Sequence, residues 1–175
     1  KANLSIDSGG ILATATNTID GTGMLNTAGN RETLVHVYGS ANVLTINVPI
    51  GGNVAPSIGG FTKGGNGTVV LGAANGNSYT GTTTLNLGIL QLASAAPDNA
   101  LFYKFSTGPA VNGITTTQNA DALVSNAGST FDLNGNSQTV GDLLSRGSIV
   151  GSGGIITNLD GGSAVTFTTM LGATA

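Results

Sequence analysis

The sequence of 175 residues lacks several residue types on which common functional sites depend. It contains no cysteine and a single histidine. Without cysteine the chain forms no disulfide, offers no thiol nucleophile and cannot hold a Cys-ligated zinc ion. With one histidine, a metal site built from several imidazole ligands is excluded as well.

Charge is also scarce. Only 7% of the residues are charged, and 5 Lys+Arg against 8 Asp+Glu give a net charge of −3; a typical globular domain has about 25% charged residues. The basic residues are far apart in the sequence: Lys1, Arg31, Lys63, Lys104 and Arg146. Nucleic-acid binding needs clustered positive charge, so the sequence argues against a nucleic-acid partner.

Long hydrophobic runs are missing too. No run approaches the roughly 20 apolar residues of a membrane-spanning helix, so we expect no such segment in this chain. No signal peptide is visible, and the chain begins at Lys1. We interpret residues 1–175 as a single domain that is a processed chain, or a slice or subunit of a larger assembly.

Short apolar runs separated by Gly, Asn and Thr are abundant. The turn Lys63–Gly67 precedes Val69–Leu71, and Gly88 separates Thr83–Leu87 from Ile89–Leu92. This alternation predicts short strands and tight turns, with no room for a helix. The 29 glycines show no three-residue period, which excludes collagen, and 39% hydrophobic residues argue against disorder.

Internal repetition indicates the fold class. Apolar pairs recur at intervals of roughly twenty residues: Leu44/Ile46, Val69/Leu71 and Leu90/Leu92. The segments Ile19–Thr27 and Ile149–Thr157 also resemble each other. A repeat of this length predicts an all-β parallel β-helix (β-solenoid) of about eight rungs, each of about 22 residues. A β-sandwich or jelly roll is the alternative, because it also has short strands at regular intervals.

One segment interrupts the regular pattern. Three of the eight aromatic residues, Phe102, Tyr103 and Phe105, fall within four positions. We predict an irregular insertion at about 95–118, or a short helix over Ala95 to Phe105. The aromatic side chains would form a patch for stacking on carbohydrate or docking a partner, or a hydrophobic plug under the insertion.

His36 is the first candidate for a catalytic or metal-binding side chain. It stands between Val35 and Val37, so on a strand it points away from them, and we expect it to face solvent. A Ser-His-Asp triad would need this histidine, but no Gly-x-Ser-x-Gly turn accompanies it.

Four aspartates are the second candidate group. Asp98, Asp121, Asp142 and Asp160 are spaced near one rung apart, so in a solenoid they would stack on one side and bind a cation or a sugar. Turn formation explains the same residues without a function, because aspartate is common in turns.

The Gly64–Thr68 segment superficially resembles a phosphate-binding loop. It lacks the Gly-Lys-Ser/Thr ending and the following helix, so we interpret it as a corner turn. The sequence therefore predicts no catalytic residue, no metal site and no cofactor, and we expect the chain not to be an enzyme.

The stretch from Gly59 to Leu92 resembles the passenger-associated transport repeat, also called the autotransporter-associated β-strand repeat. The matching segments are Phe61–Lys63, Gly65–Leu71, Asn77–Thr84 and Gly88–Leu92. The resemblance implies a right-handed β-helix within a large secreted or surface protein of a Gram-negative-type bacterium, where such repeats assist passage through the outer membrane.

Together these observations lead us to expect a structural element at the cell surface or outside the cell: a passenger stalk, an adhesin or a fibre. Its expected partner is itself, stacked end to end into filaments, or neighbouring repeats of the same polypeptide. A glycan-binding or carbohydrate-active β-helix is the alternative function, with surface glycans as the partner.

Overall fold

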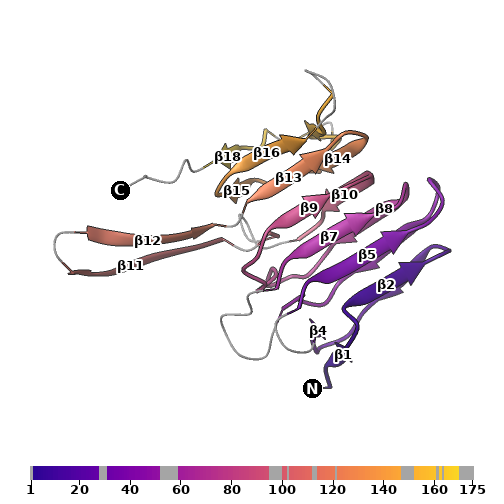
Figure 1. Cartoon of the computed structure of the whole chain (residues 1–175), viewed down its shortest axis with the longest axis horizontal. Helices are drawn as coiled ribbons and strands as arrows, with labels where there is room; N and C mark the ends of the chain where they lie inside the picture. Colours follow the sequence, from indigo (N-terminus) through magenta and orange to yellow (C-terminus); the bar gives the residue numbers. More distant parts are fainter. Residues whose placement is uncertain are drawn as a thin grey trace.

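A computed structural model describes residues 2–27, 31–51, 59–94, 100–101, 103–111, 114–120, 122–146, 152–160, 162 and 164–169. For 103–111 and 114–120 the description is of the backbone. Within these residues the chain forms short β-strands and no helix (Figure 1). The strands are β1 (Leu4–Ile6), β2 (Gly10–Ala13), β3 (Asn17–Ile19), β4 (Leu25–Thr27), β5 (Thr33–Val37), β6 (Val43–Ile46), β7 (Phe61–Gly64), β8 (Thr68–Leu71), β9 (Thr83–Leu85), β10 (Gly88–Leu92), β11 (Tyr103–Val111), β12 (Ile114–Ala120), β13 (Leu123–Asn126), β14 (Ser129–Asp132), β15 (Gln138–Val140), β16 (Leu143–Arg146), β17 (Ile155–Thr157) and β18 (Phe167–Thr169).

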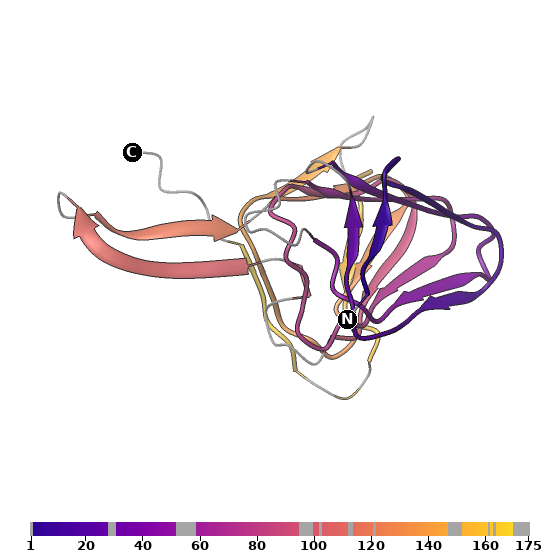
Figure 2. The ribbon, with the colours of Figure 1, turned by 90° about the horizontal axis from the view of Figure 1, so that it is seen from below.

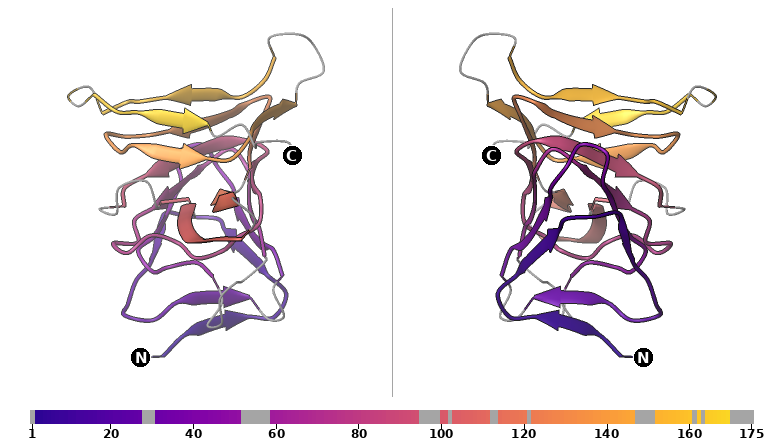
Figure 3. Two further views of the ribbon diagram at one scale, coloured as in Figure 1. Left: turned by 90° about the vertical axis from the view of Figure 1, so that its left-hand side faces the viewer. Right: turned by 90° about the vertical axis from the view of Figure 1, so that its right-hand side faces the viewer.

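The strands form three faces around one core. The first face is the parallel sheet β2-β5-β7-β9-β13-β16, and the second is the parallel sheet β3-β6-β8-β10-β14-β17. The third face contains the parallel pairs β1-β4 and β15-β18 and a parallel bridge between Leu25 and Ile50. Successive strands along the chain move from face to face, so each turn adds one rung to the stack (Figures 1 and 3). The fold is a parallel β-solenoid of about five turns.

The core consists of columns of apolar side chains that stack from rung to rung. The apolar pairs that recur in the sequence lie in register on the second face, and each side chain is at most 2% exposed. The columns are Leu44–Val69–Leu90–Phe131 and Ile46–Leu71–Leu92. This confirms the predicted solenoid and excludes the sandwich alternative, because each pair buries its apolar surface against the rungs above and below.

The predicted count of eight rungs is wrong, because the rungs are not of equal length. Gly10 pairs with Leu34, 24 positions later, and Thr33 pairs with Phe61, 28 positions later. The step from Thr83 to its partner Leu123 takes 40 positions. A mean rung length of about 22 residues therefore overestimates the number of turns.

The longest step contains a hairpin that inserts between two rungs, and its described part is neither irregular nor helical. Strands β11 and β12 pair antiparallel, with Tyr103 opposite Ala120 and Phe105 opposite Gln118. Figure 2 shows this hairpin extending away from the stacked rungs. The Thr-rich run 115–117 and the residues Val111 and Ile114 at the turn end favour strand over helix, because β-branched side chains suit an extended backbone. Phe102 and the side chains of Tyr103 and Phe105 lie outside the described part of the chain.

The internal similarity between Ile19–Thr27 and Ile149–Thr157 does not mark equivalent positions. Leu25–Thr27 pairs with Leu4–Ile6 on the third face, whereas Ile155–Thr157 pairs with Thr130–Asp132 on the second. Both segments are a short strand beside glycine, a pattern that recurs on every face of a solenoid. Residues 149–151 lie outside the described residues.

Candidate functional site: buried charges at the corners and two surface grooves

Lys63 faces the core. On β7 the side chains alternate, so Lys63 points inward and aligns with Val35 on the preceding rung and Leu85 on the next. It is 0% exposed. Lys63 was predicted as the first residue of a glycine-rich turn, and its burial was not predicted. The available signal was its period-two spacing from Phe61, which is also fully buried.

The Lys63 ammonium is enclosed by backbone carbonyl groups at the corner between the first and second faces. Its Nζ donates hydrogen bonds to the carbonyl oxygens of Gly64 (3.0 Å), Gly65 (2.6 Å) and Leu87 (2.7 Å). Leu87 belongs to the next rung, so the side chain links two rungs. Gly88 completes the enclosure with φ +72°, and a Cβ there would lie 2.7 Å from Nζ and 2.6 Å from the carbonyl oxygen of Gly65.

Burial changes the acidity of this lysine. Loss of hydration lowers the pKa of Lys63 from 10.5 to about 8, because the charged form loses solvent. Within the described residues no carboxylate pairs with it, and its hydrogen-bond partners are the three carbonyl oxygens. At neutral pH the ammonium persists with its three N–H groups donated. Lys63 is therefore a structural charge, closed to a substrate, and not a nucleophile.

His36 lies on the outer side of the same corner. It is exposed, whereas Val35 and Val37 are fully buried, which confirms the predicted alternation on β5. Its imidazole packs over Gly64, where a Cβ would come within 3.2 Å of Nδ1. The Gly64–Thr68 segment is a corner turn between β7 and β8, with no helix after it, as predicted.

Asp132 is a second buried charge, at the corner that leads from the second face to the third. It is 0% exposed. Its Oδ2 accepts a hydrogen bond from Gln91 Nε2 at 2.8 Å, and its Oδ1 accepts from the backbone N–H groups of Asn134 (3.0 Å) and Leu159 (2.9 Å). Those donors come from three different rungs, so the carboxylate joins rungs as Lys63 does. Asp132 was not predicted as a buried charge, because nothing next to it in the sequence marks it.

A tight turn at Asn134–Gly135 follows Asp132. Both residues have positive φ, 44° and 77°, as a tight turn of this kind requires. Here the turn forms a corner of the solenoid and not a hairpin. The Asn134 side chain donates to the carbonyl oxygen of Leu92, one rung away, at 2.9 Å.

The predicted stack of aspartates is wrong for the two members that the structure describes. The carbonyl oxygen of Asp142 accepts from Leu123 N–H at the start of the first face, whereas the Asp160 carboxylate lies beside Gly135, beyond the end of the second face. Asp98 and Asp121 lie outside the described residues. Across the described part of the chain, no three His, Cys, Asp or Glu side chains gather where they would hold a metal ion.

Comparisons with protein-family models, with curated proteins and with solved structures found no match. The similarity to the autotransporter-associated repeat thus rests on the sequence segments and on the β-helical repeat architecture. None of the described residues belongs to a helix with the length and apolar character needed to cross a membrane.

Two surface grooves lined by described residues are places where a ligand would fit. One, of about 450 Å³, lies on the outside of the first face near its C-terminal end. It is lined by Thr82, Thr84, Asn86, Val124, Asn126, Leu144 and Arg146. The other, of about 590 Å³, lies at the corner between the second and third faces and is called the corner groove below. Neither groove was predicted from the sequence, because each is assembled from residues of several rungs.

Proposed function

We propose that this chain is a non-enzymatic structural element of a bacterial protein at the cell surface or outside the cell, a stalk, adhesin or fibre that associates end to end. The observation that carries the proposal is the exposure of apolar side chains at the two ends of the stacked core, among the residues that the structure describes. Leu143 on the last strand of the first face is 41% exposed, whereas its partner Leu123 one rung earlier is 0% exposed. At the opposite end Leu4 is 50% exposed above the fully buried Leu25.

Strand polarity supports stacking of a second copy. All strands of the first face run parallel, so β16 of one copy meets β2 of another in the same parallel arrangement that joins the rungs inside each copy. An unpaired strand edge offers backbone N–H and C=O groups to such a partner. The contact joins different ends of two copies, so it does not close on itself, and repetition produces a filament.

Two neighbouring leucines provide the test. Leu143 faces the open end of the core, and Leu144, 44% exposed, faces outward in line with Val124. We expect Leu143→Lys to prevent association, because it places an ammonium in the stacking interface, and we expect Leu144→Lys to leave association intact. Sedimentation velocity and electron microscopy over a range of protein concentrations measure the outcome. Monomers only in the unchanged protein, or equal effects of the two substitutions, would refute the stacking.

The cellular location is a separate part of the proposal. A surface rich in Thr, Ser, Asn and Gly, with no cysteine, and the similarity to the passenger repeat support a location outside the cell. Antibody labelling of intact, unpermeabilised bacteria tests it directly. Labelling that requires lysis of the cells would refute it.

Glycan binding is the second candidate function, favoured by the corner groove. Of the four aspartates that favoured catalysis, the two described, Asp142 and Asp160, lie at different corners and do not form a catalytic pair. Binding without catalysis stands on the groove alone and is developed below.

A further inference from the structure

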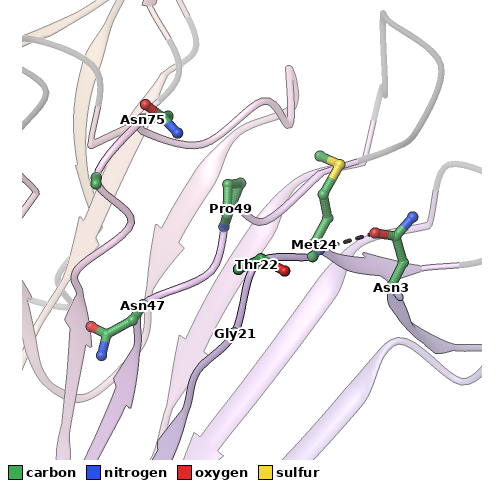
Figure 4. A pocket seen from close by; sticks show the side chains of 9 residues that line it. Asn3, Gly21, Thr22, Met24, Asn47, Pro49 and Asn75 are labelled. Atoms are coloured by element: carbon green, nitrogen blue, oxygen red, sulfur yellow. Dashed lines mark hydrogen bonds between the residues drawn. The ribbon is translucent and has the colours of Figure 1, made fainter. Parts of the chain in front are cut away.

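The corner groove runs along the axis of the solenoid. Its lining comes from four successive rungs, and Figure 4 shows Thr22, Met24 and Pro49 lying between Asn47 and Asn75 on one side and Asn3 on the other. The lining residues are Asn3, Gly21, Thr22, Gly23, Met24, Asn47, Pro49, Ala74 and Asn75. Neighbouring rungs are about 4.8 Å apart, so a groove across several rungs suits an extended chain of small units. Its volume of about 590 Å³ lies within the range of small-molecule sites.

Among the described residues, no charged and no aromatic side chain lines the corner groove. Without a cation the groove has no charge to pair with a phosphate, sulfate or carboxylate, and without a carboxylate it has no charge to pair with a metal ion or an amine. Without an aromatic ring it cannot stack a nucleobase. The ligand that fits these side chains is uncharged.

The polar groups that remain suit hydroxyl groups. A side-chain amide both donates and accepts hydrogen bonds, as a sugar hydroxyl does. Within the described residues the Asn47 amide and the Thr22 hydroxyl make no hydrogen bond, so both are available to a ligand. Met24, Pro49 and Ala74 add the apolar surface on which the C–H groups of a sugar ring rest.

The groove is held in shape by its neighbours. The Oδ1 atom of Asn3 accepts a hydrogen bond from the backbone N–H of Met24 at 3.1 Å (Figure 4). Asn47 lies so close over Gly72 that a Cβ there would be 2.3 Å from its Oδ1. Site residues that are positioned before binding lose less entropy on contact with a ligand.

We propose that the corner groove binds an uncharged oligosaccharide, lying along the solenoid axis, with Asn47, Thr22 and Asn75 bonding its hydroxyl groups. This deepens the second candidate function and does not depend on end-to-end association. A peptide is the less suitable occupant. Peptides bind sheets by adding to an open strand edge, and the strands β6 and β8 beside the groove are paired on both sides.

The test is calorimetric titration with neutral hexasaccharides of glucose (β-1,4 and α-1,4) and of N-acetylglucosamine. A hexamer of galacturonic acid is the charged comparison, and an uncharged peptide is the other. We expect binding of at least one neutral hexasaccharide, and a loss of at least about tenfold in affinity for the double variant Asn47→Ala, Asn75→Ala. The matched control, Asn86→Ala with Asn126→Ala, removes two amides from the groove on the first face, and it should change affinity less than about twofold if the ligand lies in the corner groove.

A second variant guards against loss of folding. Ala74 is exposed in the groove, so Ala74→Arg fills the groove from outside without touching the core, and it should abolish binding while the unfolding midpoint stays unchanged. The proposal is overturned if no neutral hexasaccharide binds, if only the charged hexamer or the peptide binds, or if the control variant loses as much affinity as the groove variant. Repeating the titration on the Leu143→Lys variant separates oligosaccharide binding from end-to-end association. Binding that survives in a monomer supports the groove whether or not the filament exists.

Discussion

Lys63 and Asp132 are both buried charges at solenoid corners, and the fold satisfies them in opposite ways. The Lys63 ammonium donates to three backbone carbonyl oxygens, whereas the Asp132 carboxylate accepts from two backbone N–H groups and one side-chain amide. Lys63 points into the core in line with Val35 and Leu85. Asp132 aligns with the outward-facing Gln91 on the second face and is covered by the segment that contains Leu159.

The difference shows what the corners of a solenoid offer. Where strands end, backbone groups are released from the sheet, and they must find partners if they are buried. The corner between the first and second faces presents C=O groups, which bind the Lys63 ammonium. The corner between the second and third faces presents N–H groups, which bind the Asp132 carboxylate. Buried charges therefore join rungs here without pairing with each other. Substitutions can disturb each corner separately, and the expected losses in the free energy of unfolding differ.

The largest effect is expected at the glycine that closes the Lys63 corner. Gly88→Ala should lower the free energy of unfolding by about 3–5 kcal/mol, because positive φ disfavours alanine and its Cβ would collide with Nζ and two carbonyl oxygens. Gly128→Ala is the control. Gly128 also has positive φ (82°), but its Cβ would meet the flexible side chain of Leu87 at 3.0 Å, so about 1–2 kcal/mol is expected. Urea unfolding measures both, and equal losses would show that the carbonyl enclosure is not the cause.

The second effect concerns pH. Unfolded Lys63 keeps its proton up to about pH 10.5, whereas the folded protein releases it near pH 8, so the unfolded state binds more protons between these values. The protein is therefore least stable below pH 8, where the buried Lys63 is charged. Its free energy of unfolding rises as the pH increases from 8 toward 10.5. We expect a gain of at most about 3 kcal/mol over that window.

Lys63→Met removes the titrating group and keeps an apolar stem. Urea unfolding between pH 7 and pH 10.5 should show the rise in the unchanged protein and a flat profile in this variant. The same rise in both proteins would assign it to other groups, and a fall with pH would contradict the direction of the pKa shift.

A third, smaller loss is expected at the acidic corner. Asp132→Ala leaves the donors of Gln91, Asn134 and Leu159 without their acceptor, which should cost about 2 kcal/mol. Asp142→Ala is the matched control, because Asp142 is exposed, and it should change stability by less than about 0.5 kcal/mol. Equal unfolding temperatures of the two variants would show that the buried Asp132 carboxylate does not stabilise the fold.

The smallest effect is expected for an amide pair on the solvent side of the Lys63 corner. Asn126 donates to Oδ1 of the exposed Asn86, one rung away, at 2.8 Å. Because Asn86 is open to water, Asn86→Ala should lower stability by only about 0.5 kcal/mol. A loss of stability as large as that of Asp132→Ala would mean that exposed hydrogen bonds between rungs stabilise the fold as strongly as buried charges do.

The regular part of the fold followed from the sequence, and the irregular parts did not. The pairs Leu44/Ile46, Val69/Leu71 and Leu90/Leu92 predicted the solenoid, because side chains that repeat once per rung stack on their equivalents. The rung count failed at the 40-residue step from Thr83 to Leu123, since no local signal shows where a chain leaves the stack for a hairpin and returns.

Neither buried charge was visible before the tertiary structure. In the sequence Lys63 stands beside three glycines and resembles a surface turn residue, and only its alignment with Val35 and Leu85 shows that it points inward. The grooves were equally hidden, because Asn3, Asn47 and Asn75 come together through stacking alone.

The sequence by itself determined the architecture: residues with positive-φ tolerance at corners, apolar residues inside, polar residues outside, and no cysteine or histidine cluster for catalysis. These are local properties, set by the conformational preference and solvation of each residue. Only the tertiary structure decided the number of turns, the burial of Lys63 and Asp132, and the position of the grooves. Those properties depend on which residues meet across rungs 20 to 40 positions apart in the chain, and that register is set by packing of the whole stack.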